Sequence, residues 1–247
     1  DTHEPAFGLP AKWIEASQRE EAEINGFTVV DPPSVLATHL TEFLKNNAAE
    51  ILSRQDIQLL LDNLKKEYPA VVEEVVPNLL SLAEIHKVLS NLLRERIPIR
   101  DLVSIMEALG DWAATTKDPD LLTEYVRQKL ARQIVELYKD ETGKIYCFTV
   151  EPAIEKLISE GIQSSEHGSY LVIEPKIAQE IVRELTGLLE KSRFMGKQCV
   201  VLVSPLIRRY FRKLTERTLP GIPIISYNEV PSQIELESIG MVKLGAS

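Results

Sequence analysis

The sequence predicts an α+β fold of several subdomains: a central all-helical subdomain, a C-terminal α/β subdomain after it, and a partial α/β region at the N-terminal end. Apolar residues recur at helical spacing from about residue 53 to residue 140. Beyond that point, short apolar runs alternate with helical segments, a pattern typical of α/β units. We therefore expect subdomain boundaries that separate residues 1–51, 52–140 and 141–247.

Residues 1–51 predict two helices. The glutamate-rich stretch 15–24 ends at Asn25-Gly26, which predicts a short, mostly exposed helix with a glycine stop. A β-rich run follows at 27–30. The sequence Asp31-Pro32-Pro33-Ser34 then predicts a helix start, because proline is tolerated in a first turn and Asp or Ser caps free N–H groups. Apolar residues at helical spacing predict a buried stripe on this second helix: Val35, Leu36, Leu40, Phe43 and Leu44.

Residues 52–140 predict helices throughout. Ser81-Leu82-Ala83-Glu84 matches a capping box, Asp101 precedes another helical pattern, and Asp118-Pro119-Asp120 opens the last one. After a polar break the pattern changes. Strands are expected at 145–150, 170–173, 199–203, 223–227 and 238–244, with helices at 152–160, up to about 191, and 204–218.

The charge balance argues against nucleic acid as a partner. The net charge is −9, from 37 acidic and 28 basic residues, and no basic face dominates. The densest basic run, Arg208–Lys213, is interpreted as a solvated helix face, with contact to a substrate as the alternative. Cys147 and Cys199 lie in apolar runs and predict buried thiols in a reducing compartment, although the sequence leaves a disulfide open.

No run approaches the ~18–20 apolar residues of a membrane span, and we expect no signal peptide in this sequence. The chain begins Asp1-Thr2-His3, so we expect a fragment of a longer protein. The histidines His3, His39, His86 and His167 are scattered without metal-ligand spacing. Gly196-Lys197 lacks the earlier glycine of a phosphate-binding loop. We expect no catalytic residue, metal or cofactor; a small hydrolase or nucleotide-using enzyme built on the C-terminal subdomain is the alternative.

Two Pro-punctuated apolar segments near the start, Glu4–Ile14 and Thr28–Leu40, carry a family resemblance. Further matches follow in order along the chain: Leu61–Leu64, Val76–Leu80, Lys87–Leu93, Pro98–Asp101 and Leu122–Arg127. Over essentially its whole length the sequence resembles the cytoplasmic part of the type III export-gate family (FlhA/InvA/SctV), in its flagellar branch. In that alignment residues 1–51 are parts of the first and second subdomains, truncated at the N-terminal side, and the later boundaries enclose the third and fourth.

The resemblance implies a non-enzymatic docking and gating component of bacterial flagellar protein export, with an injectisome gate as the alternative. The implied partners are export chaperones with bound substrates, an FlhB-like switch protein, the export ATPase complex and further copies of the chain in a nonameric ring. The implied location is the cytoplasmic face of the inner membrane, where the parent protein is integral and this part is soluble.

The resemblance also implies a chaperone-binding dimple lined by Glu4, Phe7, Val30 and Thr38. Glu4 stands where some relatives have aspartate, so its reach is about one methylene longer. Taken without the resemblance, Phe7 and Val30 are more typical of a hydrophobic core, and Thr38 of a helix surface. Trp13 and Trp112 are expected to be packing anchors.

Overall fold

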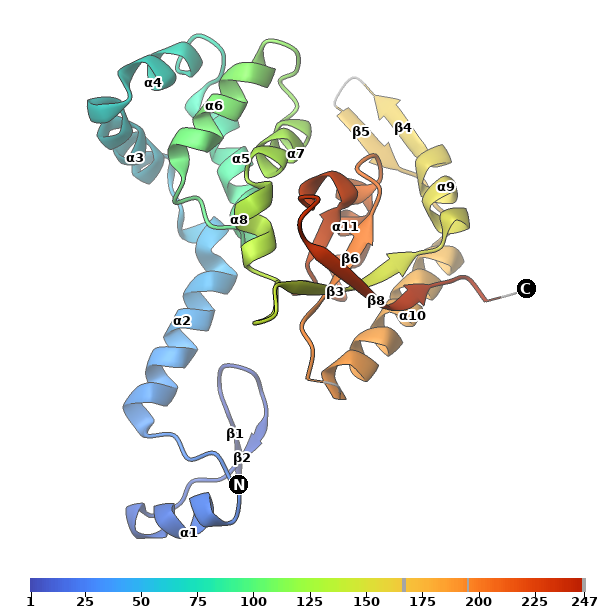
Figure 1. Ribbon diagram of the computed structural model, residues 1–247. Coiled ribbons are helices and arrows are strands. Elements are labelled where there is room, and N and C mark those ends of the chain that lie inside the picture. The colour runs from blue at the N-terminus through green and yellow to red at the C-terminus, as the bar shows by residue number, and fades with distance from the viewer. Residues whose placement is uncertain (166–167, 195, 246–247) are drawn as a thin grey trace. The chain divides into compact units, whose positions relative to one another are not determined.

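The computed structural model describes residues 1–165, 168–194 and 196–245. It divides into two units, Asp1–Ser53 (unit 1) and Arg54–Ser247 (unit 2) (Figure 1). Helices and strands both occur, and an all-helical stretch precedes a parallel sheet, so the predicted α+β class is confirmed. Among the described residues, no helix is both long enough and apolar enough to cross a membrane.

Unit 1 holds a small hairpin and helices. Strands β1 (Thr2–His3) and β2 (Pro10–Ala11) pair antiparallel, and η1 (Ala16–Gln18), α1 (Arg19–Ile24) and α2 (Pro32–Ile51) follow. The short exposed helix before Gly26 is confirmed. The strand expected at 27–30 is wrong: the Phe27 N–H donates to the Ala22 carbonyl at 3.0 Å and completes the C-terminal cap of α1, so this backbone serves the helix end.

Helix α2 begins as predicted, with the Asp31 carboxylate accepting a hydrogen bond from the Ser34 N–H at 3.2 Å. Its expected buried stripe is wrong. None of the residues of α2 is buried, and Leu40 is 50% exposed. The rest of unit 1 consists of a hairpin of two-residue strands, η1 and the short helix α1. These elements are too small to form a second layer that would bury the stripe.

Unit 2 opens with the helices α3 (Arg54–Glu67), α4 (Pro69–Val75), α5 (Leu82–Arg94), α6 (Leu102–Ala113), α7 (Pro119–Lys129) and α8 (Ala131–Glu136). The predicted caps are confirmed: Ser81 and Glu84 form a capping box, and Asp101 and Asp118 accept hydrogen bonds at the starts of α6 and α7. The last predicted helix is divided at Leu130 into α7 and α8. Stripes from these helices form a buried core that includes Ile57, Ile85, Leu89, Ile105, Leu109, Leu122 and Val126.

A parallel sheet of order β7-β6-β3-β8 follows, from β3 (Lys144–Val150), β6 (Cys199–Val203), β7 (Ile224–Ser226) and β8 (Glu235–Val242). One sheet face, with Phe148 and Val201, packs in a common core with α9 (Pro152–Glu160), α10 (Pro175–Phe194) and α11 (Arg208–Thr215). The expected strand at 170–173 forms as β5 (Gly168–Leu171), paired with the polar strand β4 (Ile162–Ser165), which the sequence analysis missed. Cys147 and Cys199 are buried free thiols.

The interpretation of Arg208–Lys213 as a solvated face is wrong. Arg208 is buried and donates to Glu95 at 2.7 Å and to Glu124 at 2.5 Å. Arg127, only 2% exposed, donates to Glu95 at 3.0 Å and to Glu229 at 2.6 Å. We call these five residues the buried ion cluster.

The buried ion cluster joins the helical part of unit 2 to the α/β part. Glu95 lies in the turn after α5, and Glu124 and Arg127 lie in α7; Arg208 comes from α11 and Glu229 from η2 (Tyr227–Glu229). Burial alone would raise the pKa of Glu95, but the two arginines lower it to about 2.

Candidate functional site

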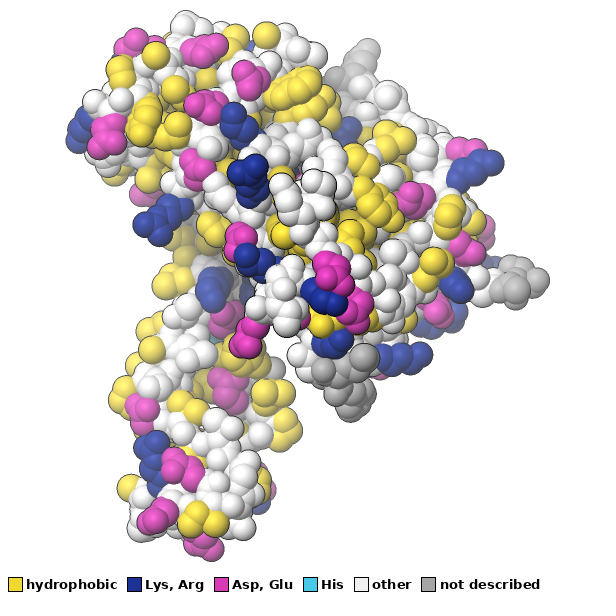
Figure 2. Space-filling view, viewed as in Figure 1, with side chains coloured by type: hydrophobic (Ala, Val, Ile, Leu, Met, Phe, Trp, Pro, Cys, Tyr) yellow, Lys and Arg dark blue, Asp and Glu magenta, His cyan; other side chains and the backbone are white. Residues whose placement is uncertain are grey.

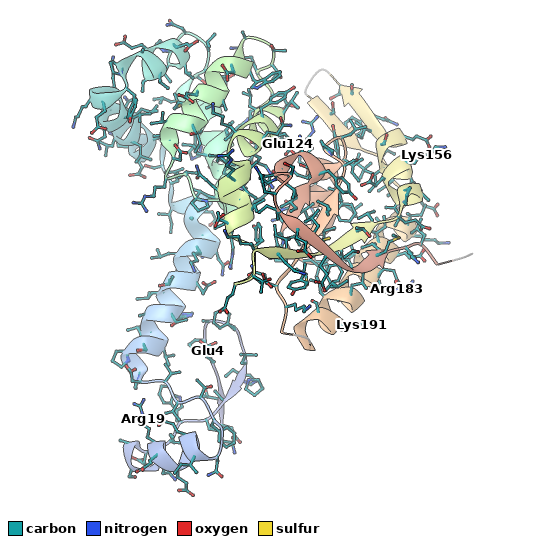
Figure 3. All side chains as sticks on the ribbon, viewed as in Figure 1. Glu4, Arg19, Glu124, Lys156, Arg183 and Lys191 are labelled. Atoms are coloured by element: carbon teal, nitrogen blue, oxygen red, sulfur yellow. The ribbon has the colours of Figure 1, made fainter. Side chains whose placement is uncertain are left out.

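The predicted site residues Glu4 and Phe7 lie on the loop that joins β1 to β2, where Figure 3 labels Glu4. The Glu4 N–H donates to the Leu9 carbonyl at 2.7 Å, and the Gly8 N–H donates to the Glu4 carbonyl at 2.8 Å. Gly8 has φ +69°, which glycine adopts without a steric cost. These bonds close the base of the loop and leave Phe7 at its tip.

The Glu4 side chain also binds its own loop. Its Oε1 accepts a hydrogen bond from the Ala6 N–H at 2.8 Å, and its Oε2 accepts one from the Phe7 N–H at 2.7 Å. Among the four predicted site residues, Glu4 and Phe7 are the pair that a hydrogen bond joins. Val30 and Thr38 lie elsewhere in unit 1, before the first turn of α2 and in its second turn.

The structure places the predicted apolar site residues on the surface. Phe7 is 62% exposed and Val30 is 49% exposed, so neither belongs to the hydrophobic core of the described chain. Thr38 is exposed on α2. Trp13 is also exposed, and its expected role as a packing anchor is wrong. Trp112 does pack as expected, stacked on Tyr125 with ring centroids 3.9 Å apart.

More than half of the exposed large apolar side chains of the described chain lie in the first 53 residues. Figure 2 shows hydrophobic side chains on the surface of this unit. We call the set the unit-1 apolar surface; it comprises Phe7, Leu9, Trp13, Ile14, Ile24, Phe27, Val30, Leu36, Leu40, Phe43, Leu44 and Ile51. Exposed apolar residues in such number are typical of a surface that binds another protein. The helical spacing of the α2 members predicted a buried stripe, but spacing alone does not show which residues cover a stripe.

The carboxyl ends of the parallel strands, where such sheets bind phosphate ligands, carry carboxylates instead. Glu155, in the first turn of α9, accepts a hydrogen bond from the Ser204 N–H at the end of β6 at 2.8 Å. Glu151, just after β3, accepts one from the Leu244 N–H at 3.3 Å. Burial raises the pKa of Tyr227 at the end of β7, and the charge of Glu155 adds to the rise. A bound phosphate would need N–H donors such as those of Ser204 and Leu244, which already donate to Glu155 and Glu151. The two carboxylates would also repel its negative charge, so this edge does not fit a nucleotide.

Metal ligands are not brought together in the part of the chain that the structure describes, since it holds no group of three or more His, Cys, Asp or Glu side chains arranged around a common point. His167, one of the histidines considered from the sequence, lies outside the described residues. The site that the geometry does present is therefore the unit-1 apolar surface, which offers contact area and few reactive groups.

Comparison with known proteins gives a consistent family. The model of the FHIPEP family matches residues 1–235. The flagellar biosynthesis protein FlhA of Bacillus subtilis (strain 168) is 46% identical over 244 residues, which is 99% of this chain and 36% of the relative. The chain thus spans about a third of the length of that curated relative.

Solved structures of similar fold come from type III secretion proteins. CdsV of Chlamydia pneumoniae superposes with a TM-score of 0.89 at 30% identity, covering 98% of this chain and 69% of the other. A second CdsV structure, with a TM-score of 0.83, is a complex with CdsO. The nonameric SctV-C of EPEC has a TM-score of 0.80 at 30% identity and covers 92% and 68% of the two chains. With the family model matched over nearly all of its residues and a flagellar FlhA at 46% identity, this chain belongs to the FHIPEP family of export-gate proteins.

Proposed function

We propose that the chain is a docking and gating part of the flagellar type III export apparatus, and that its unit-1 apolar surface binds export chaperones carrying their substrates. The observation that carries this proposal is the exposure of large apolar side chains in unit 1, with Phe7 at the tip of a hydrogen-bonded loop. An aromatic side chain held on a closed loop is a suitable anchor for a protein partner.

Three of the four predicted residues take different parts in the proposed site. Phe7 supplies the aromatic contact, Val30 a neighbouring apolar wall, and the Thr38 hydroxyl a hydrogen-bonding group that orients the partner. We propose that chaperones bind through an apolar helical face, because such a face complements exposed aromatic and aliphatic side chains.

The assembly is proposed from the relatives. The ring of EPEC SctV-C supports a nonamer of this chain, and the CdsV–CdsO complex supports a further partner protein. We assign residues 1–51 to parts of the first and second subdomains, 52–140 to the third and 141–247 to the fourth. The remaining proposed partners are an FlhB-like switch protein and the export ATPase complex, at the cytoplasmic face of the inner membrane.

The flagellar branch is favoured over the injectisome branch, because identity is 46% to a flagellar relative and 30% to CdsV and EPEC SctV-C. A nucleotide-using enzyme is disfavoured by the carboxylates at the carboxyl edge of the sheet.

The test is calorimetric titration of the full-length protein with a flagellar export chaperone bound to its filament subunit, both from the organism of this chain. Phe7→Ala should weaken binding about 30-fold, equivalent to about 2 kcal/mol, and Thr38→Ala by a smaller factor. Leu206→Ala is the matched control, because Leu206 is 63% exposed, like Phe7, but lies in unit 2. Equal affinity for wild type and Phe7→Ala in folded protein would contradict the proposal.

A further inference from the structure

We infer that Glu4 is a positioning residue of the docking site: it holds Phe7 in place through main-chain hydrogen bonds and offers no charge for the partner to bind. This inference rests on the proposed function and assigns to Glu4, the fourth predicted residue, a role that acts through Phe7.

Glu4 takes part in four hydrogen bonds that shape the loop. Its N–H and carbonyl bond to Leu9 and Gly8 at 2.7 and 2.8 Å, and its two carboxylate oxygens take the N–H groups of Ala6 and Phe7 at 2.8 and 2.7 Å. Bonds from an N–H to an ionised carboxylate are shorter and stronger than those between neutral groups. The main-chain position of Phe7 is therefore set by the side chain of Glu4.

Each oxygen of the carboxylate already accepts an N–H of the loop, so the side chain is oriented toward its own main chain before a partner binds. Phe7 is held at its N–H by Glu4, and the residue is 62% exposed, so its side chain is accessible to a partner. Because the loop is already ordered in the unbound protein, less conformational entropy is lost at Phe7 when the partner binds. Loss of the Glu4 carboxylate should therefore act on binding through Phe7.

Three substitutions separate position from charge. Glu4→Ala removes both acceptors and should weaken chaperone binding about tenfold. Glu4→Gln keeps one acceptor oxygen without the charge and should lose only a few-fold. Glu4→Asp keeps a carboxylate that can accept from N–H groups two and three residues later, so it should bind within about twofold of wild type.

The deciding experiment is a double-mutant cycle of Glu4→Ala and Phe7→Ala in the full-length protein, titrated with the same chaperone–filament subunit complex. Because Glu4 acts through Phe7, the double variant should bind no more weakly than Phe7→Ala alone. Losses that multiply would show an independent contact of Glu4 with the partner and would overturn the inference. A shallower salt dependence for Glu4→Gln than for wild type would overturn it as well.

Hydrogen–deuterium exchange of the unbound protein tests the positioning itself. The Ala6 and Phe7 amides should exchange at least tenfold faster in Glu4→Ala, while amides of α5 stay unchanged and show that the fold is intact. Unchanged exchange at Ala6 and Phe7 would refute the hydrogen-bonded role of Glu4. Failure of the docking proposal is distinguishable, because in that case Phe7→Ala itself would bind like wild type.

Discussion

Helix α5 in unit 2 and helix α2 in unit 1 both carry an apolar stripe at helical spacing, yet α5 buries its stripe and α2 does not. Leu89 of α5 is 0% exposed and Leu40 of α2 is 50% exposed. Helices α3 and α7 contact α5, whereas the described part of unit 1 contains one further short α-helix and a small hairpin. An amphipathic pattern specifies a face that favours burial; the partner that buries it is a separate property of the fold.

The carboxylates of the two units differ in the same way. In unit 1, Glu4 and Asp31 accept hydrogen bonds from N–H groups two or three residues further along the chain. In unit 2, Glu95 and Glu229 pair with arginines that are distant in sequence. Unit 2 also has local carboxylate bonds, at the starts of α6 and α7, but it adds long-range ion pairs to them. The comparison implies that substitutions in unit 2 should act mainly on stability, and those in unit 1 mainly on binding.

The largest effect is expected from the buried ion cluster. Arg127→Ala removes a partner from Glu95 and Glu229, and leaving such carboxylates uncompensated should lower the free energy of unfolding by about 3–5 kcal/mol. Urea unfolding followed by Trp112 fluorescence in a Trp13→Phe background measures it. Arg183→Ala, which removes an exposed arginine labelled in Figure 3, should change stability by less than about 0.5 kcal/mol. Equal effects of the two variants would refute a structural role for the cluster.

A matched leucine pair tests the comparison directly. Leu89→Ala should cost about 3 kcal/mol of unfolding free energy, because it opens a cavity in the helical core of unit 2. Leu40→Ala should cost less than about 1 kcal/mol, because half of that side chain is already in water. The same denaturant series measures both. A loss of several kcal/mol for Leu40→Ala would mean that α2 is held by its stripe after all.

Acid should destabilise unit 2 through Glu95. Its pKa is lowered from an ordinary 4.5 to about 2, so the stabilisation is present above pH 4.5 and is lost as pH falls toward 2. At ~1.4 kcal/mol per pKa unit, the loss is at most about 3.5 kcal/mol. Unfolding curves between pH 5.5 and pH 2.5, in about half-unit steps, would show it. Glu95→Gln should flatten this slope; an unchanged slope would assign the acid sensitivity to other carboxylates.

The smallest effect is expected from a glycine pair. Gly8 has φ +69°, so Gly8→Ala should strain the loop by about 1 kcal/mol and speed exchange of the Phe7 amide. Gly187 lies within α10, and a Cβ there would meet no atom within 4 Å. Gly187→Ala should therefore stabilise the protein by up to about 1 kcal/mol. Hydrogen exchange of the Phe7 amide measures the effect of Gly8→Ala, and thermal unfolding measures the effect of Gly187→Ala. Slower exchange of the Phe7 amide in Gly8→Ala would contradict the loop geometry.

Features governed by nearby residues could be predicted from the sequence. The capping box at Ser81 and the helix starts at Asp101 and Asp118 depend on residues within one turn, and all three are confirmed. The run at Arg208–Lys213 resembles any charged helix face, because its carboxylate partners lie far away in the chain: Arg208 pairs with Glu124, 84 residues away, and with Glu95, 113 residues away. No local pattern marks such a pairing.

The sequence predicted the residues of the candidate site but not the hydrogen bonds within it. Its residues were predicted from the family resemblance, and their role as a chaperone-binding site stays a prediction. Without the resemblance, Phe7 and Val30 were more typical of a core. The hydrogen bonds of the Glu4 side chain had no sequence signal, because a glutamate before Pro5 is compatible with many loop conformations. The strand expected at 27–30 failed for a local reason, since the end of α1 takes the Phe27 N–H.

The strand order β7-β6-β3-β8 has a consequence for biosynthesis. Strand β8 pairs with β3, so Lys144 lies opposite Glu235, and one edge of β3 stays open until the ribosome has released residues 235–242. Until then the incomplete sheet exposes unpaired backbone N–H and C=O groups next to apolar strands, which favours aggregation. Translation that pauses before residue 235 should therefore yield chains that depend on holding chaperones, whereas the helical segment before Asp140 is able to pack as it emerges.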